Sequence, residues 1–300
     1  MQELFEVGRL ITEDSNNPYL HLAYKNKYKH YRLISSGEVF IKCRNIEIPE
    51  FVKSFIQNNN NVLMMANIIS GKVVGLTFRT IEGEKDFLTW GNNKGNFYGL
   101  GQMSPNFKFG DPIILVEGLM DCDVIKQYYP NTLAVLTSGL TKNQIAVLTR
   151  LTNNVILMFD NDDAGVRGTR ASEQAIRSKC KVTVFQHYPK LKDPGDIIKS
   201  EINKDPDLDF IIDYYKIGIK NIVRWVMTIN ITMSKEEFLE YLNYQEFKSK
   251  VKCGIIDLES ITNELMKEMF NDGIWVDHNK YDKLLKKLIT STDNIKKGAE

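Results

Sequence analysis

The sequence predicts an α/β protein built on a parallel sheet with crossover helices, with an N-terminal α+β subdomain and a C-terminal helical subdomain. Between residues 111 and 205, short and continuously apolar runs alternate with stretches of helical spacing. This alternation is typical of strands that are buried on both faces and joined by helices. Earlier residues form β-rich runs with hairpin turns, and no strand-like run follows the alternating region. We therefore divide the chain into residues 1–110, 111–205 and 206–300.

The N-terminal subdomain is predicted from β-rich runs separated by turn signals. Ser70-Gly71 and Glu82–Glu84 each join two runs into a hairpin. Pro49 opens a short helix that extends to Gln57, since proline is favoured in the first helical turn. The predicted strands are Tyr31–Ile34, Glu38–Lys42, Val62–Ile69, Lys72–Arg79 and Asp86–Trp90.

The central region alternates strands and helices with short connections. Parallel strands cannot be joined by tight turns, so each pair needs a crossover connection. The predicted strands are Ile113–Val116, Leu133–Leu136, Val155–Phe159 and Val182–Gln186, and the predicted helices are Leu119–Tyr128, Thr141–Leu151 and Ala164–Ser178.

The last 95 residues or so are predicted to be helical. Ser234 and Glu237 form a capping-box pattern that opens a helix through Tyr241. Apolar residues on one helical face follow Asp257, and Tyr281–Ile289 fits a final helix. Ordinary bundle packing and docking to a partner protein both fit this region.

Composition excludes several classes of protein. With 43% hydrophobic and 26% charged residues among 300, the chain is not disordered. No apolar run approaches the ~20 residues that cross a bilayer, so we expect no membrane partner. The four cysteines lie far apart without a CxxC pair, which predicts neither zinc nor disulfides and favours a cytoplasmic setting. The net charge is +1, so nucleic-acid binding would require a local basic patch.

Acidic residues follow three of the four predicted central strands. Ligands of open parallel sheets bind beyond the carboxyl ends of the strands, so these acids are expected to gather at one edge. Alternate side chains of an extended D-x-D segment point the same way, and acids four apart on a helix share a face. The acids are Glu117 and Asp121, then Asp160 and Asp162, then Asp193 and Asp196.

A cluster of carboxylates at one edge is unfavourable without a counter-charge. Oxygen ligands without nearby His or Cys indicate Mg²⁺ or Mn²⁺, which commonly handle phosphates. Any one such acid could instead cap a helix, and we interpret Asp123 and Asp163 in that way. Asp193 to Asp196 alone would be an ordinary turn. Three clusters in order are hard to explain as caps, so together they predict a metal site.

The order of these acids resembles the TOPRIM module shared by bacterial-type primases, topoisomerases and some nucleases. The flanking segments are similar to those of DnaG-like DNA primases over roughly residues 60–200, although the chain starts without the zinc-binding domain found at the N-terminus of bacterial members. Gly195 stands where the family has a second acid, which leaves open whether Asp193, Asp196 or both reach a metal. The matching segments are Ile68–Arg79, Lys85–Leu88, Lys94–Leu100 (KGNFYGL), Thr137–Thr141 and Lys192–Pro194.

The resemblance implies a Rossmann-like TOPRIM sheet and a primase that makes short RNA primers on single-stranded DNA during replication. It implies a nucleotidyl transfer that depends on Mg²⁺ or Mn²⁺. The implied catalytic residues are Glu117, Asp121, Asp160 and Asp162; the implied metal ligands are Glu117, Asp160, Asp162, Asp193 and Asp196; and the implied nucleotide-binding residues are Arg79, Lys85 and Lys94.

The resemblance also implies partners. These are the single-stranded DNA template, ribonucleoside triphosphates, a replicative helicase, and a separate zinc-binding or accessory replication protein. A compact chain of this kind suits a bacteriophage or mobile element, whose product would work in the bacterial host cytoplasm.

Residues Tyr24–Arg32 interleave basic and aromatic side chains, a pattern that suits single-stranded DNA. We take Lys25, Lys27, Lys29 and Arg32 as candidate template-binding residues; a solvated amphipathic segment or edge strand is the alternative. For the whole chain, the alternatives are a TOPRIM nuclease or topoisomerase fragment, and a non-catalytic nucleic-acid-binding or helicase-loading module.

Overall fold

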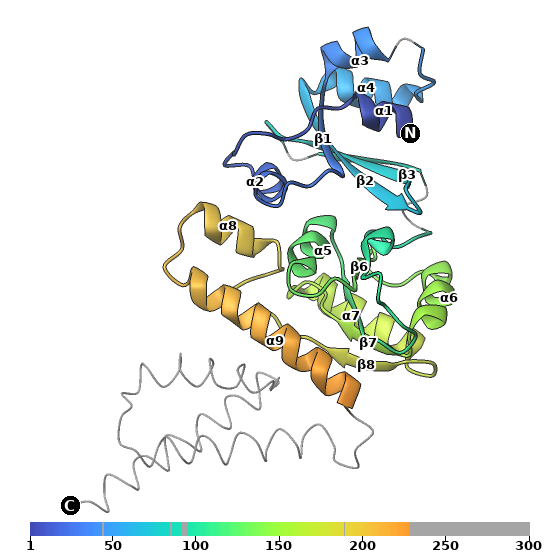
Figure 1. Ribbon diagram of the computed structural model, residues 1–300, viewed down its shortest axis with the longest axis vertical. Helices are drawn as coiled ribbons and strands as arrows, with labels where there is room; N and C mark the ends of the chain where they lie inside the picture. The colour runs from blue at the N-terminus through green and yellow to red at the C-terminus, as the bar shows by residue number, and fades with distance from the viewer. Residues whose placement is uncertain (44, 85, 92–94, 189, 229–300) are drawn as a thin grey trace, which may run out of the picture. The chain divides into compact units, whose positions relative to one another are not determined.

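The computed structural model describes residues 1–43, 45–84, 86–91, 95–188 and 190–228 (Figure 1). The chain forms two compact units, Met1–Leu208 and Asp209–Glu300. The first unit contains one antiparallel and one parallel sheet, so the predicted α/β class is confirmed. Its first part consists of α1 (Gln2–Val7), α2 (Pro18–Lys25), β1 (Tyr31–Ser35), α3 (Ser36–Lys42), α4 (Glu50–Asn58), β2 (Asn61–Ile69), β3 (Lys72–Thr80) and β4 (Phe87–Gly91).

The antiparallel sheet has the strand order β1-β2-β3-β4. The predicted hairpin turn between β2 and β3 is confirmed, and both Ser70 and Gly71 have positive φ values, 51° and 75°. Two consecutive left-handed residues give the twist that a two-residue hairpin requires. The strands predicted at residues 31–34, 62–69, 72–79 and 86–90 all belong to this sheet.

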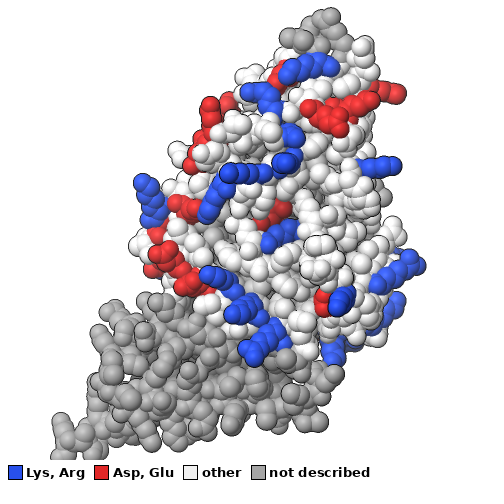
Figure 2. Space-filling model, viewed as in Figure 1, with Lys and Arg blue, Asp and Glu red and all other residues white. Residues whose placement is uncertain are grey.

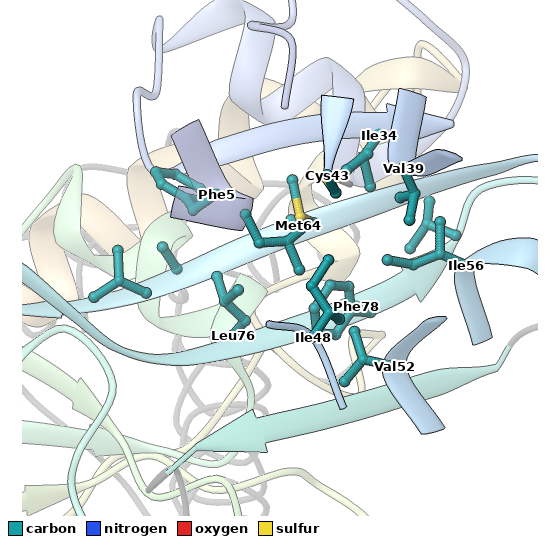
Figure 3. Close-up of a cluster of buried hydrophobic side chains, with 14 residues drawn as sticks. Phe5, Ile34, Val39, Cys43, Ile48, Val52, Ile56, Met64, Leu76 and Phe78 are labelled. Atoms are coloured by element: carbon teal, nitrogen blue, oxygen red, sulfur yellow. The ribbon is translucent and has the colours of Figure 1, made fainter. Parts of the chain in front are cut away.

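Both faces of this sheet are covered, because alternate residues of each strand point to opposite sides. Figure 3 shows one face, where Met64, Leu76 and Phe78 pack against Phe5 of α1 and Val52 of α4. Leu63 and Met65 point to the other face and pack with Leu20 and Ala23 of α2 and with Tyr31. The N-terminal subdomain thus has helices on both sides of one sheet.

The strand predicted at Glu38–Lys42 is wrong, because these residues belong to helix α3. Ser35 is the N-cap, and its hydroxyl accepts a hydrogen bond from the backbone N–H of Glu38 at 3.3 Å. The Glu38 carboxylate accepts one in return from the N–H of Ser35 at 2.9 Å. This capping box overrides the β-branched and aromatic residues that follow it.

The second sheet is wholly parallel and has the order β6-β5-β7-β8. The chain moves to one side after β5 and crosses to the other side before β7, so the carboxyl ends of β5 and β7 flank a topological switch point. A 3-10 turn, Leu100–Gln102, precedes the sheet. The elements are β5 (Ile113–Val116), α5 (Leu119–Lys126), β6 (Thr132–Ala134), α6 (Lys142–Leu151), β7 (Asn154–Leu157), α7 (Asp163–Ile176), β8 (Lys181–Val184) and α8 (Asp196–Ile202).

The strands β5 and β6 are buried throughout and β7 is buried apart from its first residue, whereas only Thr183 of β8 is buried. Leu115 and Leu157 pack against Leu148 of α6 and Ile176 of α7. The second unit is described only over α9 (Leu208–Thr228), a helix that the sequence analysis did not single out. The helices predicted from Ser234 onward lie outside the described residues.

Candidate metal and nucleotide site

Glu117 and Asp160 lie at the switch point, where β5 and β7 end. Oε1 of Glu117 accepts a hydrogen bond from the backbone N–H of Asp160 at 3.2 Å. This bond ties the two loops together, as expected for acids that follow neighbouring parallel strands. Desolvation and the nearby charges of Asp160 and Asp162 raise the pKa of Glu117 to about 7.

Asp160 and Asp162 share one cation, the ammonium of Lys192. The Lys192 Nζ atom lies 3.1 Å from Oδ2 of Asp160 and 3.1 Å from Oδ2 of Asp162. Asp162 is also the N-cap of α7, where its Oδ1 accepts a hydrogen bond from the N–H of Gly165 at 2.9 Å. The N–H of Gly165 and Lys192 together hold the pKa of Asp162 below its ordinary value. Both acids of the D-x-D segment therefore form an ion pair with the same ammonium group.

Asp121 lies on the first turn of α5 and is buried. Its two oxygens accept hydrogen bonds from the N–H groups of Gly195 at 2.9 Å and Gly118 at 3.1 Å. Burial and the charges of Asp193 and Asp160 nevertheless raise its pKa well above the ordinary value. Asp121 thus joins the β5 loop to the loop after β8.

Asp193 and Asp196 have different surroundings. Burial and the charges of Asp196 and Asp160 raise the pKa of Asp193. Burial acts on Asp196 too, but its bonds with Lys199 and with the backbone N–H of Lys192 keep its pKa below the ordinary value. The structure brings Asp193 into the electrostatic environment of Asp121 and Asp160, whereas Asp196 has its own counter-charge.

Arg79 is the one sequence-predicted nucleotide-binding residue among the described positions; Lys85 and Lys94 lie outside them. The Arg79 guanidinium stacks 4.3 Å from the centre of the Tyr19 ring. Burial raises the pKa of Tyr19, and the charges of Asp121 and Asp193 act in the same direction. Tyr19, which the sequence analysis missed, therefore contacts Arg79 and is influenced by the charges of two members of the acidic cluster, which we define as Glu117, Asp121, Asp160, Asp162 and Asp193.

The interpretation of Asp123 as a helix cap is wrong. Asp123 is 1% exposed in the middle of α5, and its Oδ2 accepts hydrogen bonds from the hydroxyls of Tyr31 at 2.8 Å and Tyr98 at 2.7 Å. His30 Nε2 lies 3.3 Å from the same atom, and the Tyr28 hydroxyl donates to the backbone oxygen of Asp123 at 2.9 Å. Asp123 therefore joins β1, the segment around Tyr98, and α5.

Asp163 does not cap α7 either, because the N-cap is Asp162 and Asp163 is the first helical residue. It is exposed. Sequence alone could not distinguish between two adjacent aspartates for the cap position.

The candidate template segment is not a continuous stacking surface. Tyr31 is fully buried, so its ring cannot stack on a base. Lys25 Nζ pairs with Glu201 of α8 at 2.6 Å, while Lys27 and Lys29 are exposed. The Arg32 guanidinium lies 5.3 Å from the centre of the Phe5 ring, and its buried Nε and Nη1 have no hydrogen-bond partner.

The fold and the acidic cluster agree with comparisons to known proteins. A family model described as Toprim-like matches residues 114–198, from β5 into α8. DNA primase from Clostridium acetobutylicum is 30% identical over 248 residues, covering 79% of this chain and 37% of the relative. DNA primase from Staphylococcus epidermidis is 29% identical over 185 residues, covering 59% and 30%.

A solved structure, the E. coli primase catalytic core, shares the fold with a TM-score of 0.51 and 16% identity over 92% of this chain and 97% of that one. Residues 114–198 are thus Toprim-like, and most of the chain is similar to part of the DNA primases. The chain spans little more than a third of the length of the curated relatives that it matches, at most 37% in the two just described.

The donor set of the Toprim-like region fits a divalent metal ion. The carboxyl oxygens of Glu117, Asp160 and Asp193 come from three loops, and oxygen atoms are the ligands that Mg²⁺ and Mn²⁺ prefer. Burial, together with the charges of neighbouring carboxylates, raises the pKa of Glu117 and of Asp193. Within the described part of the chain, no three His, Cys, Asp or Glu side chains are already arranged as a metal site. No described helix is long and apolar enough to span a membrane.

Proposed function

We propose that this chain is the catalytic part of a DNA primase, which joins ribonucleotides into short RNA primers on a single-stranded DNA template during replication. The observation that carries this proposal is the acidic cluster at the β5/β7 switch point of a Toprim-like region, together with Arg79, whose guanidinium stacks on the ring of Tyr19. A nucleotidyl transfer needs such anions and cations around the triphosphate.

The metal that this site would take is Mg²⁺ or Mn²⁺. Glu117, Asp160, Asp162 and Asp193 would hold it, and Asp196 is the weaker candidate because its oxygens are engaged by Lys199 and a backbone N–H. When bound, such an ion neutralises charge on the phosphates and lowers the pKa of the attacking 3′-hydroxyl.

The residues of the chain supply the remaining chemistry. Glu117 would serve either as a shared metal ligand or as the general base that accepts the proton of the 3′-hydroxyl; without metal its pKa is raised to about 7. Asp121 is a positioning residue, since its oxygens fix the N–H groups of Gly118 and Gly195. Arg79 would bind the triphosphate through its planar guanidinium, and Lys85 and Lys94 would add point charges.

The broader setting of this function is also part of the proposal. The substrates would be ribonucleoside triphosphates and single-stranded DNA, with Lys27 and Lys29 as the contacts to the template backbone. The weaker candidates are Lys25, which pairs with Glu201, and Arg32, whose Nε and Nη1 are buried. Cooperation with a replicative helicase and an accessory replication protein is part of the proposal. We retain residues 1–110, 111–205 and 206–300 as its proposed functional division.

The test is primer synthesis by matched variants. The wild type, Asp160→Asn and Asp163→Asn would be incubated with single-stranded DNA, labelled ribonucleotides and either Mg²⁺ or Mn²⁺. Asp160→Asn removes one charge from the acidic cluster and is expected to lower the rate at least about 100-fold, the scale of losing one group that stabilises transition-state charge. Asp163→Asn removes the same charge three residues away and is expected to stay within about two-fold of the wild type.

Two outcomes would contradict the proposal. Degraded DNA without any RNA product would identify a TOPRIM nuclease. Template binding without either product, unchanged by Asp160→Asn, would identify a non-catalytic nucleic-acid-binding module.

A further inference from the structure

Among the described residues, Lys192 is the basic residue that pairs with both Asp160 and Asp162, the two acids of the D-x-D segment. Its Nζ atom is 3.1 Å from Oδ2 of Asp160 and 3.1 Å from Oδ2 of Asp162. These carboxyl groups come from the loop after β7, and Lys192 comes from the loop after β8, so the contact closes one side of the acidic cluster. The Lys192 side chain remains 53% exposed, which leaves it free to move into solvent.

The backbone of Lys192 is held independently of its ammonium. The Lys192 carbonyl accepts a hydrogen bond from the N–H of Asn161 at 2.7 Å. Its own N–H donates to Oδ2 of Asp196 at 2.9 Å. The two loops therefore stay together when the side chain changes, and the role of the charge can be separated from the role of the loop.

We propose that Lys192 is a tethered counter-ion, which neutralises Asp160 and Asp162 when no metal is bound and which a divalent cation must displace to occupy the site. The inference rests on the metal site of the proposed function and adds a residue that competes with the metal. The ammonium lies 3.1 Å from both Oδ2 atoms, the position that a cation bridging the two carboxylates would take. A divalent ion and an ammonium at that position would also repel each other.

Competition of this kind lowers the apparent metal affinity. If metal binds only while Lys192 has moved away, the apparent association constant is the intrinsic constant multiplied by the fraction of molecules in which the site is open. Lys192 also forms two ion pairs that a neutral side chain would lack. If each ion pair has the strength usual for exposed pairs, breaking both weakens the apparent binding of metal by about 2- to 30-fold.

The test measures Mn²⁺ binding directly, by calorimetry and by the electron paramagnetic resonance signal of free Mn²⁺, without nucleotide or DNA. Lys192→Met is expected to bind Mn²⁺ about 2- to 30-fold more tightly than the wild type, and Lys192→Gln is expected to do the same. Lys192→Arg keeps the charge and is expected to stay close to the wild type.

Two reference variants complete the design. Lys190→Met removes the same charge two residues away, where Lys190 pairs with Asp207, and is expected to leave Mn²⁺ affinity unchanged. Asp160→Asn is expected to weaken Mn²⁺ binding strongly. Circular dichroism would establish that each variant is folded, and Lys192→Gln replaces Lys192→Met if the latter is not.

The outcomes separate this inference from the proposed function. If Asp160→Asn weakens binding but both neutral Lys192 variants bind like the wild type or more weakly, Lys192 is not a competitor and only this inference is overturned. If the wild type and Asp160→Asn bind Mn²⁺ equally, the metal site itself is wrong and the inference falls with it.

Discussion

Glu117 shows how burial and neighbouring carboxylates change the protonation of a single residue in the acidic cluster. Its carboxyl lies beside Asp160 and Asp162, and its pKa is raised from an ordinary 4.5 to about 7. In the absence of metal, the folded protein holds a proton on Glu117 up to about pH 7, whereas the unfolded chain releases it near pH 4.5. Because the folded state binds more protons between these values, its stability falls as the pH rises through this window.

This linkage gives a measurable difference between the wild type and Glu117→Gln. The free energy of unfolding of the wild type, relative to that of the variant, is expected to fall by about 1 kcal/mol between pH 4 and pH 8 without divalent ions. This free-energy difference is smaller than the whole pKa shift would give, because Glu117 is only half buried and solvent screens its interactions. Urea denaturation at several pH values provides the measurement. Parallel stability curves for the two proteins would show that Glu117 does not titrate as we expect.

The acids could be predicted from sequence because each follows a strand, and the parallel order brings strand ends together whatever the details of packing. Lys192 could not be assigned a partner in this way. Its Nζ reaches Asp160 and Asp162 only because the loop after β8 turns back toward β7, held by the hydrogen bond from Asn161. A loop geometry that depends on single hydrogen bonds leaves no periodic signal in the sequence.

At the scale of elements, Gly165 decides how closely α7 approaches the end of β7. A Cβ atom on Gly165 would lie 2.1 Å from the backbone oxygen of Asp160. Gly165→Ala is therefore expected to lower the free energy of unfolding by about 1–3 kcal/mol, the usual cost of overpacking, and to shift Asp160. Gly37→Ala in α3 is the control, because a Cβ there meets nothing within 4 Å. Equal stability of Gly165→Ala and the wild type in urea would contradict the expectation.

Asp123 connects three elements by side-chain hydrogen bonds. Asp123→Ala would leave the hydroxyls of Tyr31 and Tyr98 buried without an acceptor, and we expect it to cost about 3–5 kcal/mol of stability. Tyr98→Phe removes one bond to the carboxyl group and is expected to cost about 1.5–3 kcal/mol. Chemical denaturation measures both, with the exposed Asp163→Asn expected to remain within about 0.5 kcal/mol of the wild type. Small effects of both Asp123→Ala and Tyr98→Phe would mean that apolar packing alone joins these elements.

Regular elements were predicted well where the hydrophobic period was clear and poorly where a cap decided the outcome. Each of the four parallel strands contains a short run of apolar or β-branched residues between turn signals, so they were found. Helix α3 was missed because its strand-like residues follow a capping box at Ser35 and Glu38. The cluster around Asp123 was missed because it depends on tertiary contacts between residues far apart in the sequence, 25 positions for Tyr98 and 92 for Tyr31.

At the scale of the whole molecule, charge is nearly balanced, and a template must be held by a local patch. The net charge is +1, and on the face that Figure 2 shows, basic side chains form a broken band with acidic side chains beside it. Lys27 and Lys29 are exposed between α2 and β1, and neither forms an ion pair with an acid in the described part of the chain, whereas Lys25 pairs with Glu201.

The double variant Lys27→Gln/Lys29→Gln therefore tests where single-stranded DNA binds. Each phosphate contact contributes about 0.7 to the slope of log K against log salt for single strands, so losing two contacts should flatten the slope by about 1.4. Lys72→Gln/Lys142→Gln removes the same charge from the starts of β3 and α6 and should leave the slope nearly unchanged. Fluorescence anisotropy over a series of salt concentrations gives both slopes. Equal flattening in the two double variants would mean that DNA responds to the total charge of the protein, and that the segment before β1 is solvated surface.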